Sequence, residues 1–323
     1  MQLTTFDAPS VQSVEWYGDD LVDWVAGGCV YSSSGAVTPA NVRYSYSFDA
    51  AAVSTSGEYV ALYTRRATKG LLLRHGKVIR EFNRSFYQAD AYDFPIEFVT
   101  LADGREAIAH CPAEYNRLDF EVAATGEIVT TDSARKPADY FFSRLKTSPN
   151  GQYLASGGWV WHPQDVPHVY EVQSAEKNPQ LLDGHGADLS IWADESSLAF
   201  LSDTELVVGI GGYANDDETE IVGTEIRTFA LKGEVAELKG SVRTTERITL
   251  ISRFAGGGVL ALGKYPLIVD SVTGEILKAW PDLTLKSVPR SATDLPSRDF
   301  IIAVNDDCTR FALWRDGKIH VLS

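Results

Sequence analysis

The sequence predicts an all-β chain folded as a seven-bladed β-propeller of four-stranded antiparallel blades. Short segments rich in β-branched and aromatic residues are separated by turn signals about every 8 to 12 residues, which is typical of all-β architecture. A polar turn with glycine recurs at a fixed distance, since Gly57, Gly104 and Gly151 are each 47 residues apart. A period near 45 residues with four strands per unit is the signature of propeller blades.

Two turn types place the strands within each blade. The first is a small polar pair before an apolar run, and it occurs at Asp19-Asp20, Ser56-Gly57, Asp103-Gly104, Asn150-Gly151, Glu195-Ser196, Gly257-Gly258 and Asp306-Asp307. The second contains a glycine suited to a tight hairpin, at residues 74–78, 124–128, 231–235 and 272–276. We therefore expect blades to start near residues 10, 44, 92, 139, 187, 245 and 296.

The two ends of the chain complete one blade in this interpretation. The last repeat contains only three strands, whereas residues 2–6 alternate and precede the first complete repeat. An open ring would leave two bare strand edges, so we expect the N-terminal strand to close the last blade. Closure predicts a single domain over residues 1–323.

Motifs in the middle of the chain resemble the WD40-like β-propeller superfamily. They are Ser148-Pro149-Asn150-Gly151-Gln152-Tyr153-Leu154-Ala155-Ser156, Val169-Tyr170-Glu171-Val172, and Leu182-Asp183-Gly184-His185 followed by Ile191-Trp192. The Trp-Asp dipeptide itself is absent. The resemblance implies a propeller in which His185 braces a blade, and it says little about function because propellers host many functions.

Charge and termini narrow the class of partner. The net charge is −15, which disfavours nucleic acid and anionic membranes and makes a basic protein the more plausible partner. Three widely spaced cysteines do not suggest a disulfide framework, and the first residues lack a signal peptide, so we expect a cytoplasmic monomer. Nucleophile-elbow, zincin and Walker sequences are absent, so no catalytic residue, cofactor or metal is assigned and enzyme activity is not expected.

Aromatic side chains suggest a binding surface. In a propeller, the connections between blades and the loops between second and third strands emerge on the same face. Such segments contain Phe86, Tyr87 and Tyr92 in one connection, and Trp159, Trp161 and Tyr213 in or near two loops. Exposed aromatic residues would anchor a protein partner, whereas buried ones would pack between blades.

Three further polar groups leave alternatives open. His162, Asp165 and His168 could surround a divalent cation, form an interaction loop or simply connect strands. Asp216, Asp217 and Glu218 belong to an acidic loop that suits solvent, a basic partner or calcium. The basic run of residues 65–84 could protect a sheet edge, dock an acidic partner or contact nucleic acid.

The sequence is therefore interpreted as a protein-interaction scaffold or adaptor. The acidic charge suggests a variant of this role, a neutralising partner of a basic protein, as an immunity protein is for a toxin. The alternative is a function in the central channel of the propeller. The protein would then be a metal-dependent enzyme of the lactonase-like or lyase-like kind, or a binder of a small ligand. The sequence identifies neither the partner nor the face used.

Overall fold

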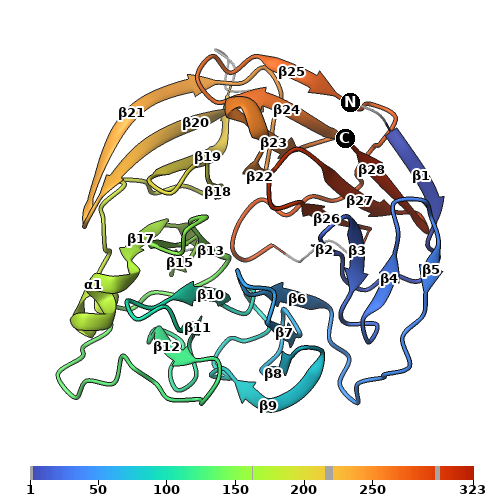
Figure 1. The fold of residues 1–323 in the computed structure, drawn as a ribbon. Helices are drawn as coiled ribbons and strands as arrows, with labels where there is room; N and C mark the ends of the chain where they lie inside the picture. The colour runs from blue at the N-terminus through green and yellow to red at the C-terminus, as the bar shows by residue number, and fades with distance from the viewer. Residues whose placement is uncertain (1–2, 162, 215–220, 295–298) are drawn as a thin grey trace.

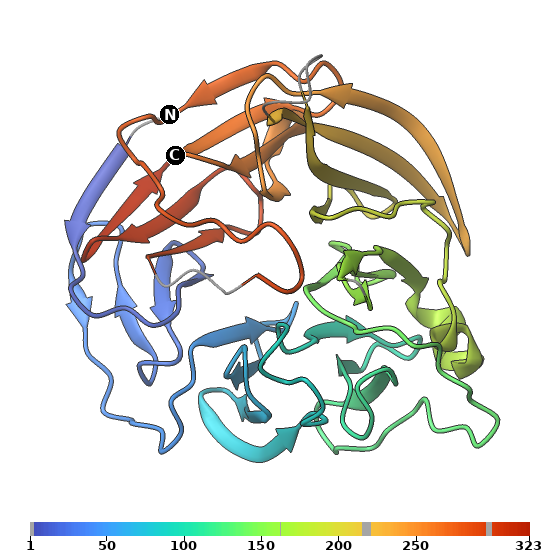
Figure 2. The ribbon, with the colours of Figure 1, turned by 180° about the vertical axis from the view of Figure 1, so that it is seen from behind.

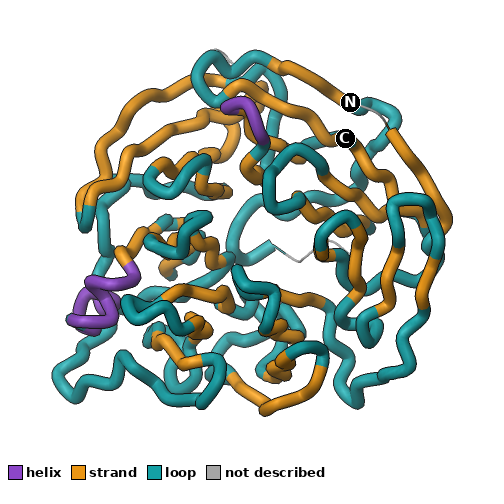
Figure 3. Tube along the Cα trace, in the orientation of Figure 1, coloured by secondary structure: helices purple, strands orange, loops and turns teal. Residues whose placement is uncertain are grey.

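The computed structural model describes residues 3–161, 163–214, 221–294 and 299–323. Antiparallel sheets are arranged around a central axis, and each extends outward from an innermost strand (Figure 1). The molecule is an all-β seven-bladed propeller, as predicted. Strands and loops make up nearly all of the ring, and helix is confined to short segments (Figure 3).

The first three blades follow one another along the chain from residue 15. Blade 1 contains β2 (Glu15–Tyr17), β3 (Asp20–Asp23), β4 (Cys29–Tyr31) and β5 (Val37–Thr38). Blade 2 contains β6 (Ala50–Val53), β7 (Tyr59–Tyr63), β8 (Lys69–Arg74) and β9 (Lys77–Asn83). Blade 3 contains β10 (Ile96–Thr100), β11 (Glu106–His110) and β12 (Asp119–Val122), with a single bridge from Glu121 to Ile128 in the outer position.

Blade 4 departs most from the repeat. Its sheet has β13 (Leu145–Thr147), β14 (Tyr153–Ser156) and β17 (His168–Glu171). The hairpin β15 (Trp159–Val160) and β16 (Gln164–Asp165) is inserted between its second and third strands. After β17 come the helix α1 (Val172–Lys177) and the 3₁₀ turn η1 (Pro179–Asp183), which lie at the periphery of the ring (Figure 1).

The remaining blades have four strands each. Blade 5 has β18 (Ser196–Phe200), β19 (Glu205–Ala214), β20 (Ile221–Lys232) and β21 (Val235–Arg243). Blade 6 has β22 (Leu250–Arg253), the 3₁₀ turn η2 (Ala255–Gly257), β23 (Gly258–Leu262), β24 (Pro266–Asp270) and β25 (Ile276–Ala279). Blade 7 has β26 (Phe300–Val304), β27 (Phe311–Arg315), β28 (Lys318–Leu322) and β1 (Leu3–Asp7).

The N-terminal strand closes the ring, as the sequence predicts. β1 pairs antiparallel with β28, from Leu3 opposite Leu322 to Asp7 opposite Lys318. Beyond the ladder, the indole N–H of Trp314 donates to the carbonyl of Ala8 at 2.8 Å. Both chain ends therefore lie in the same sheet (Figure 1).

Packing between neighbouring blades forms the core. Within the described residues, seven clusters of buried apolar side chains each join two adjacent blades around the ring. Leu72 of blade 2 and Ile108 of blade 3, for example, share a cluster and are fully buried. The glycines of the recurring turns, such as Gly57 and Gly104, have positive φ values of 72° and 85°, which let the tight turns form.

A long connection between blades 6 and 7 crosses the middle of the ring (Figures 1 and 2). We call residues 280–294 the crossing segment. Leu283 and Leu285 are buried against blades 6 and 7, and the Leu285 N–H donates to the carbonyl of Lys264 at 2.8 Å. The far end of the segment reaches blades 2, 4 and 5.

None of the described helices is long and apolar enough to span a membrane.

Candidate functional site

Loops of two kinds meet on one face of the ring. Because the strands of a blade alternate in direction, the connection to the next blade and the loop between second and third strands leave the sheet at the same end. We call this the loop face. On it lie the connection 84–95, the loop 111–118, the residues before β13, and the β15–β16 hairpin.

Six aromatic rings from these segments form one cluster on the loop face. Phe141 is central, stacked on Trp159 with ring centroids 4.1 Å apart and lying 4.6 Å from Tyr115 and 5.2 Å from Trp161. Two tyrosines of the connection 84–95 complete the group. We define the aromatic cluster as Tyr87, Tyr92, Tyr115, Phe141, Trp159 and Trp161.

The cluster has a buried floor and an exposed rim. Tyr92 and Trp159 are only 1% and 3% exposed, and Phe141 is fully buried. Tyr87 and Trp161 are 43% and 45% exposed, so both present ring surface to solvent above this floor. A rigid aromatic floor holds the exposed rings in place, which lowers the entropy lost when a partner binds them.

The sequence prediction located part of this cluster. It named Tyr87, Tyr92, Trp159 and Trp161, which the fold brings together from two separate segments. Tyr92 and Trp159 are buried and form the floor of the cluster, so for these two residues the burial agrees with the alternative of packing between blades.

Other predicted residues lie elsewhere. Phe86 is 86% exposed beside the cluster. Tyr213 belongs to β19, and its side chain lies outside the described residues, as do His162, Asp216, Asp217 and Glu218. The prediction does not include Tyr115 and Phe141. Tyr115 is the one aromatic residue in the loop 111–118, and Phe141 lies in a stretch with no strand signal.

Acidic side chains lie on the segments that carry the aromatic cluster. Asp90, Glu114 and Asp139 are exposed on the same segments, and the Tyr115 hydroxyl donates to Asp139 at 2.8 Å. Burial, followed by this hydrogen bond and the nearby charges, raises the pKa of Tyr115 to about 12. In the connection 84–95 and the loop 111–118 the cations are engaged within the protein, since Arg84 is buried and Arg117 is paired with Asp119 at 3.2 Å.

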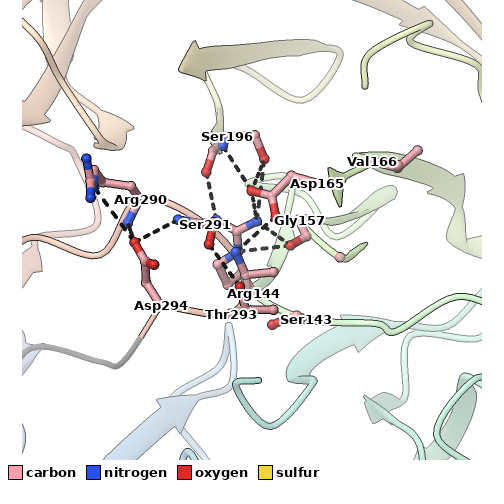
Figure 4. A network of polar contacts seen from close by, with 12 residues as sticks. Ser143, Arg144, Gly157, Asp165, Val166, Ser196, Arg290, Ser291, Thr293 and Asp294 are labelled. Carbon is pink, nitrogen blue, oxygen red and sulfur yellow. Dashed lines mark hydrogen bonds and ion pairs between the residues drawn. The ribbon is translucent and has the colours of Figure 1, made fainter. Parts of the chain in front are cut away.

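The ion pair between Arg144 and the buried Asp165 belongs to a polar network that includes residues of the crossing segment (Figure 4). Asp165 is 1% exposed and accepts from Arg144 at 2.8 Å, from the N–H and hydroxyl of Ser196, both at 2.9 Å, and from the N–H of Ala292 at 3.0 Å. Ala292 in turn packs against Tyr92, Phe141 and Trp159. Burial raises the pKa of Asp165, although Arg144 and the hydrogen bonds act in the opposite direction.

His168 has a bracing position. It is 2% exposed, stacks on Tyr140 at 3.9 Å, and has Nδ1 3.0 Å from the Tyr170 hydroxyl. The Tyr170 hydroxyl donates its proton to the Gly184 carbonyl, so it must accept from Nδ1 of His168. The other ring nitrogen of His168, Nε2, therefore accepts from Nδ1 of His185 at 2.7 Å. Burial, and then the charge of His185, lowers the pKa of His168 to about 3.

The metal alternative for residues 162–168 gains no support from this geometry. Asp165 and His168 are both bound by other groups of the protein. Asp165 pairs with Arg144, whereas His168 contacts the Tyr170 hydroxyl. In the described part of the chain, no three or more His, Cys, Asp or Glu side chains are grouped so that they could hold a metal ion.

Four of the seven lysines and arginines in the basic run of residues 65–84 are held by contacts within the ring. Arg66 contacts Asp93 at 3.2 Å, Arg74 contacts Glu58 at 2.5 Å, and Arg80 contacts Glu121 at 2.6 Å. Arg84 is buried, with its guanidinium 4.4 Å from the centre of the Tyr92 ring. These pairs divide the positive charge among several interfaces instead of concentrating it in one surface patch.

Three charged residues lie on innermost strands near the central axis. Glu15 is on β2, Glu97 on β10 and Lys146 on β13, and the three interact electrostatically. Burial raises the pKa of Glu15 to about 7, against the attraction of Lys146 and together with the repulsion of Glu97. Burial also raises the pKa of Glu97.

Comparison with solved structures defines the fold type. The chain is similar to the β-propeller domain of Cps50 (Swd1) from Myceliophteria thermophila, with a TM-score of 0.63 and 13% identity over 99% of both chains. It is similar to the Pan2 WD40 domain of Neurospora crassa, with a TM-score of 0.55 and 11% identity over 97% of this chain and 88% of that one. The chain has the propeller fold of WD40 domains.

A third similarity shows how widely this fold is used. Hydrazine synthase of Kuenenia stuttgartiensis matches with a TM-score of 0.59 and 13% identity, over 98% of this chain and 96% of that one. No protein-family model and no curated protein sequence matches this chain. At such low identity the likeness concerns the fold alone, and function must be argued from the surface.

Proposed function

We propose that this protein is an interaction scaffold of the WD40-like type that docks a basic protein on its loop face. The observation that carries the proposal is the aromatic cluster, in which exposed Tyr87 and Trp161 rest on a buried floor of Tyr92, Phe141 and Trp159. Aromatic anchors held in place by packing are typical of the energetic centre of a protein interface.

The charges around the cluster favour a cationic partner. Asp90, Glu114 and Asp139 would attract lysine and arginine side chains, and the rings of Tyr87 and Trp161 can accept the same cations over their faces. The net charge of −15 would steer such a partner toward the ring before contact. A neutralising role toward a basic protein, comparable to that of an immunity protein, is the specific form of this proposal.

Affinity capture tests the proposal with matched surface variants. The wild type, Trp161→Ala and Tyr17→Ala are immobilised at about 50 mM and about 300 mM salt, and captured proteins are identified. Tyr17 is 60% exposed at the turn between β2 and β3, on the face opposite the loop face, so it controls for general stickiness. Trp161→Ala should lose a basic protein that Tyr17→Ala retains, and the purified partner should reproduce this in titration.

Two results would contradict the proposal. One is a partner that binds equally to the wild type and Trp161→Ala, since the aromatic cluster would then make no contact. The other is a captured protein without excess positive charge whose binding is unchanged by salt.

A second candidate is ligand binding in the central channel. The interacting charges of Glu15, Glu97 and Lys146 on innermost strands favour it, because such groups can bind or transfer protons to a polar ligand. Metal analysis of the purified protein is the first measurement. A stoichiometric ion that is lost on Glu97→Gln substitution would support an enzyme of the lactonase-like or lyase-like class, and an ion that the variant retains would count against it.

A further inference from the structure

A cavity of about 300 Å³ lies on the loop face, away from the aromatic cluster. Its walls come from three places: the connection between blades 5 and 6, the turn between β23 and β24, and the crossing segment. The hydrogen bond from the Leu285 N–H to the Lys264 carbonyl fixes the crossing segment against the turn. This cavity is independent of the surface proposed for protein docking.

The charge of the lining is opposite to that of the whole chain. Arg247, Lys264, Lys286 and Arg290 line the cavity, against one carboxylate, Glu246. The chain as a whole has 29 lysines and arginines and 44 aspartates and glutamates. A second cavity, on the opposite face, has a net negative lining, because Glu58 and Glu106 accompany a single cation, Arg105. The two cavities therefore differ in the sign of their lining charge.

Two of the cations are held in place and two are available. Arg247 and Arg290 both contact the carboxylate of Glu195, the second at 3.2 Å, and Arg290 also lies 3.9 Å from Asp294, so these carboxylates orient both guanidinium groups. Lys264 makes no ion pair within the described residues, and Lys286 has only a 3.9 Å contact with Asp316. Both lysines are exposed at the cavity.

From this geometry we infer that the cavity is a binding site for a phosphoryl group. Arginine forks and lysine ammonium groups together match the oxygens of a doubly charged anion. Leu285 and Val288 supply an apolar wall, which suits the organic part of a phosphate ester better than a free ion.

Calorimetric titration at constant ionic strength tests the site. The probes are inorganic phosphate, a nucleoside monophosphate, a phosphoserine peptide and acetate, with chloride adjusted so that general screening stays fixed. Phosphoryl probes should saturate, and acetate should not compete. Binding by the monophosphate or inorganic phosphate but not by the peptide would identify a small metabolite as the source, and the reverse would identify a modified protein.

Paired lysine variants distinguish the cavity from general charge. Lys264→Gln with Lys286→Gln should weaken phosphoryl binding about tenfold or more, because two of the cations are removed. The control is the double variant Lys77→Gln with Lys239→Gln, which removes two positive charges from exposed positions outside the cavity. Its affinity for the phosphoryl probes should stay within about twofold of the wild type. All four side chains are exposed, so folding should be preserved. Equal losses in both variants, or no saturation by any phosphoryl probe, would overturn the inference.

Discussion

Glu15 shows how burial and charge oppose each other at a single residue. Its carboxyl group has a pKa of about 7 in the folded chain, against an ordinary value of 4.5, because burial outweighs the attraction of Lys146. The folded state therefore binds more protons than the unfolded chain between those two pH values. Stability must fall as the pH rises through this range, and the cost is fully present above about pH 7.

Replacing Glu15 by glutamine should remove this cost without changing the side-chain shape. We expect Glu15→Gln to be more stable than the wild type by about 1–3 kcal/mol at pH 8 and to differ little at pH 4, as measured by urea unfolding. Glu234→Gln, in the exposed turn between β20 and β21, serves as the control and should show no such trend. A constant difference at both pH values would contradict the burial argument.

Residue type alone does not show which side chains of the aromatic cluster are exposed and which are buried. Trp159 and Trp161 are two positions apart, yet one is 3% exposed and the other 45%. Their difference depends on Phe141, which stacks on Trp159 from a segment with no repeat signal. The sequence predicts that aromatic residues converge on this face, but only tertiary packing decides which of them a partner could reach.

At the scale of elements, the crossing segment is the feature that local pattern could not predict. The strands begin 4 to 9 residues after the predicted blade starts, because recurrent turns specify them locally. The crossing segment instead depends on contacts with distant residues, such as the Ala292 N–H bond to Asp165 and the Arg66 bond to the Asp294 carbonyl. Likewise, α1 takes the place of a regular outer strand in blade 4, at a point where the sequence has no clear copy of the second turn type.

A charge placed beneath the aromatic cluster should release this segment. Ala292 is 1% exposed among Tyr92, Phe141 and Trp159, so the Ala292→Asp variant would bury an unpaired carboxylate close to Asp165. We expect trypsin to cleave after Lys286 or Arg290 at least about tenfold faster than in the wild type, because the segment opens locally. Cleavage sites are read by mass spectrometry.

The matched control is Ala134→Asp, at an exposed position in the loop before blade 4. It should leave cleavage of the crossing segment unchanged. If Ala292→Asp accelerated cleavage evenly over all blades, the effect would be global unfolding, and the view of the segment as a locally attached element would fail.

At the scale of the whole molecule, the ring depends on the pairing of β1 with β28. Removing residues 1–7 would expose the edge of β28 and uncover part of the cluster between blades 7 and 1, in which Phe6 packs. We expect the melting temperature to fall on the order of 10 °C and soluble aggregates to appear. Calorimetry and size-exclusion chromatography measure these effects.

A matched substitution separates strand pairing from side-chain loss. Leu3→Ala changes a side chain that is 49% exposed and keeps the backbone ladder, so it should cost little. A synthetic peptide of residues 1–12, added to the truncated protein, should restore part of the lost stability. A truncated protein as stable as the wild type would show that the other blades hold the ring without closure.

The pairing of β1 with β28 also sets an order for biosynthesis. The ribosome makes Leu3 before any blade exists, while its partner Leu322 emerges only after six blades have been synthesised. During translation, β1 must stay unpaired and must avoid the open edges of its own unfinished sheets and of neighbouring nascent chains. Until β28 has been made, β1 lacks its partner strand, and an unpaired strand of an incomplete fold is exposed to aggregation.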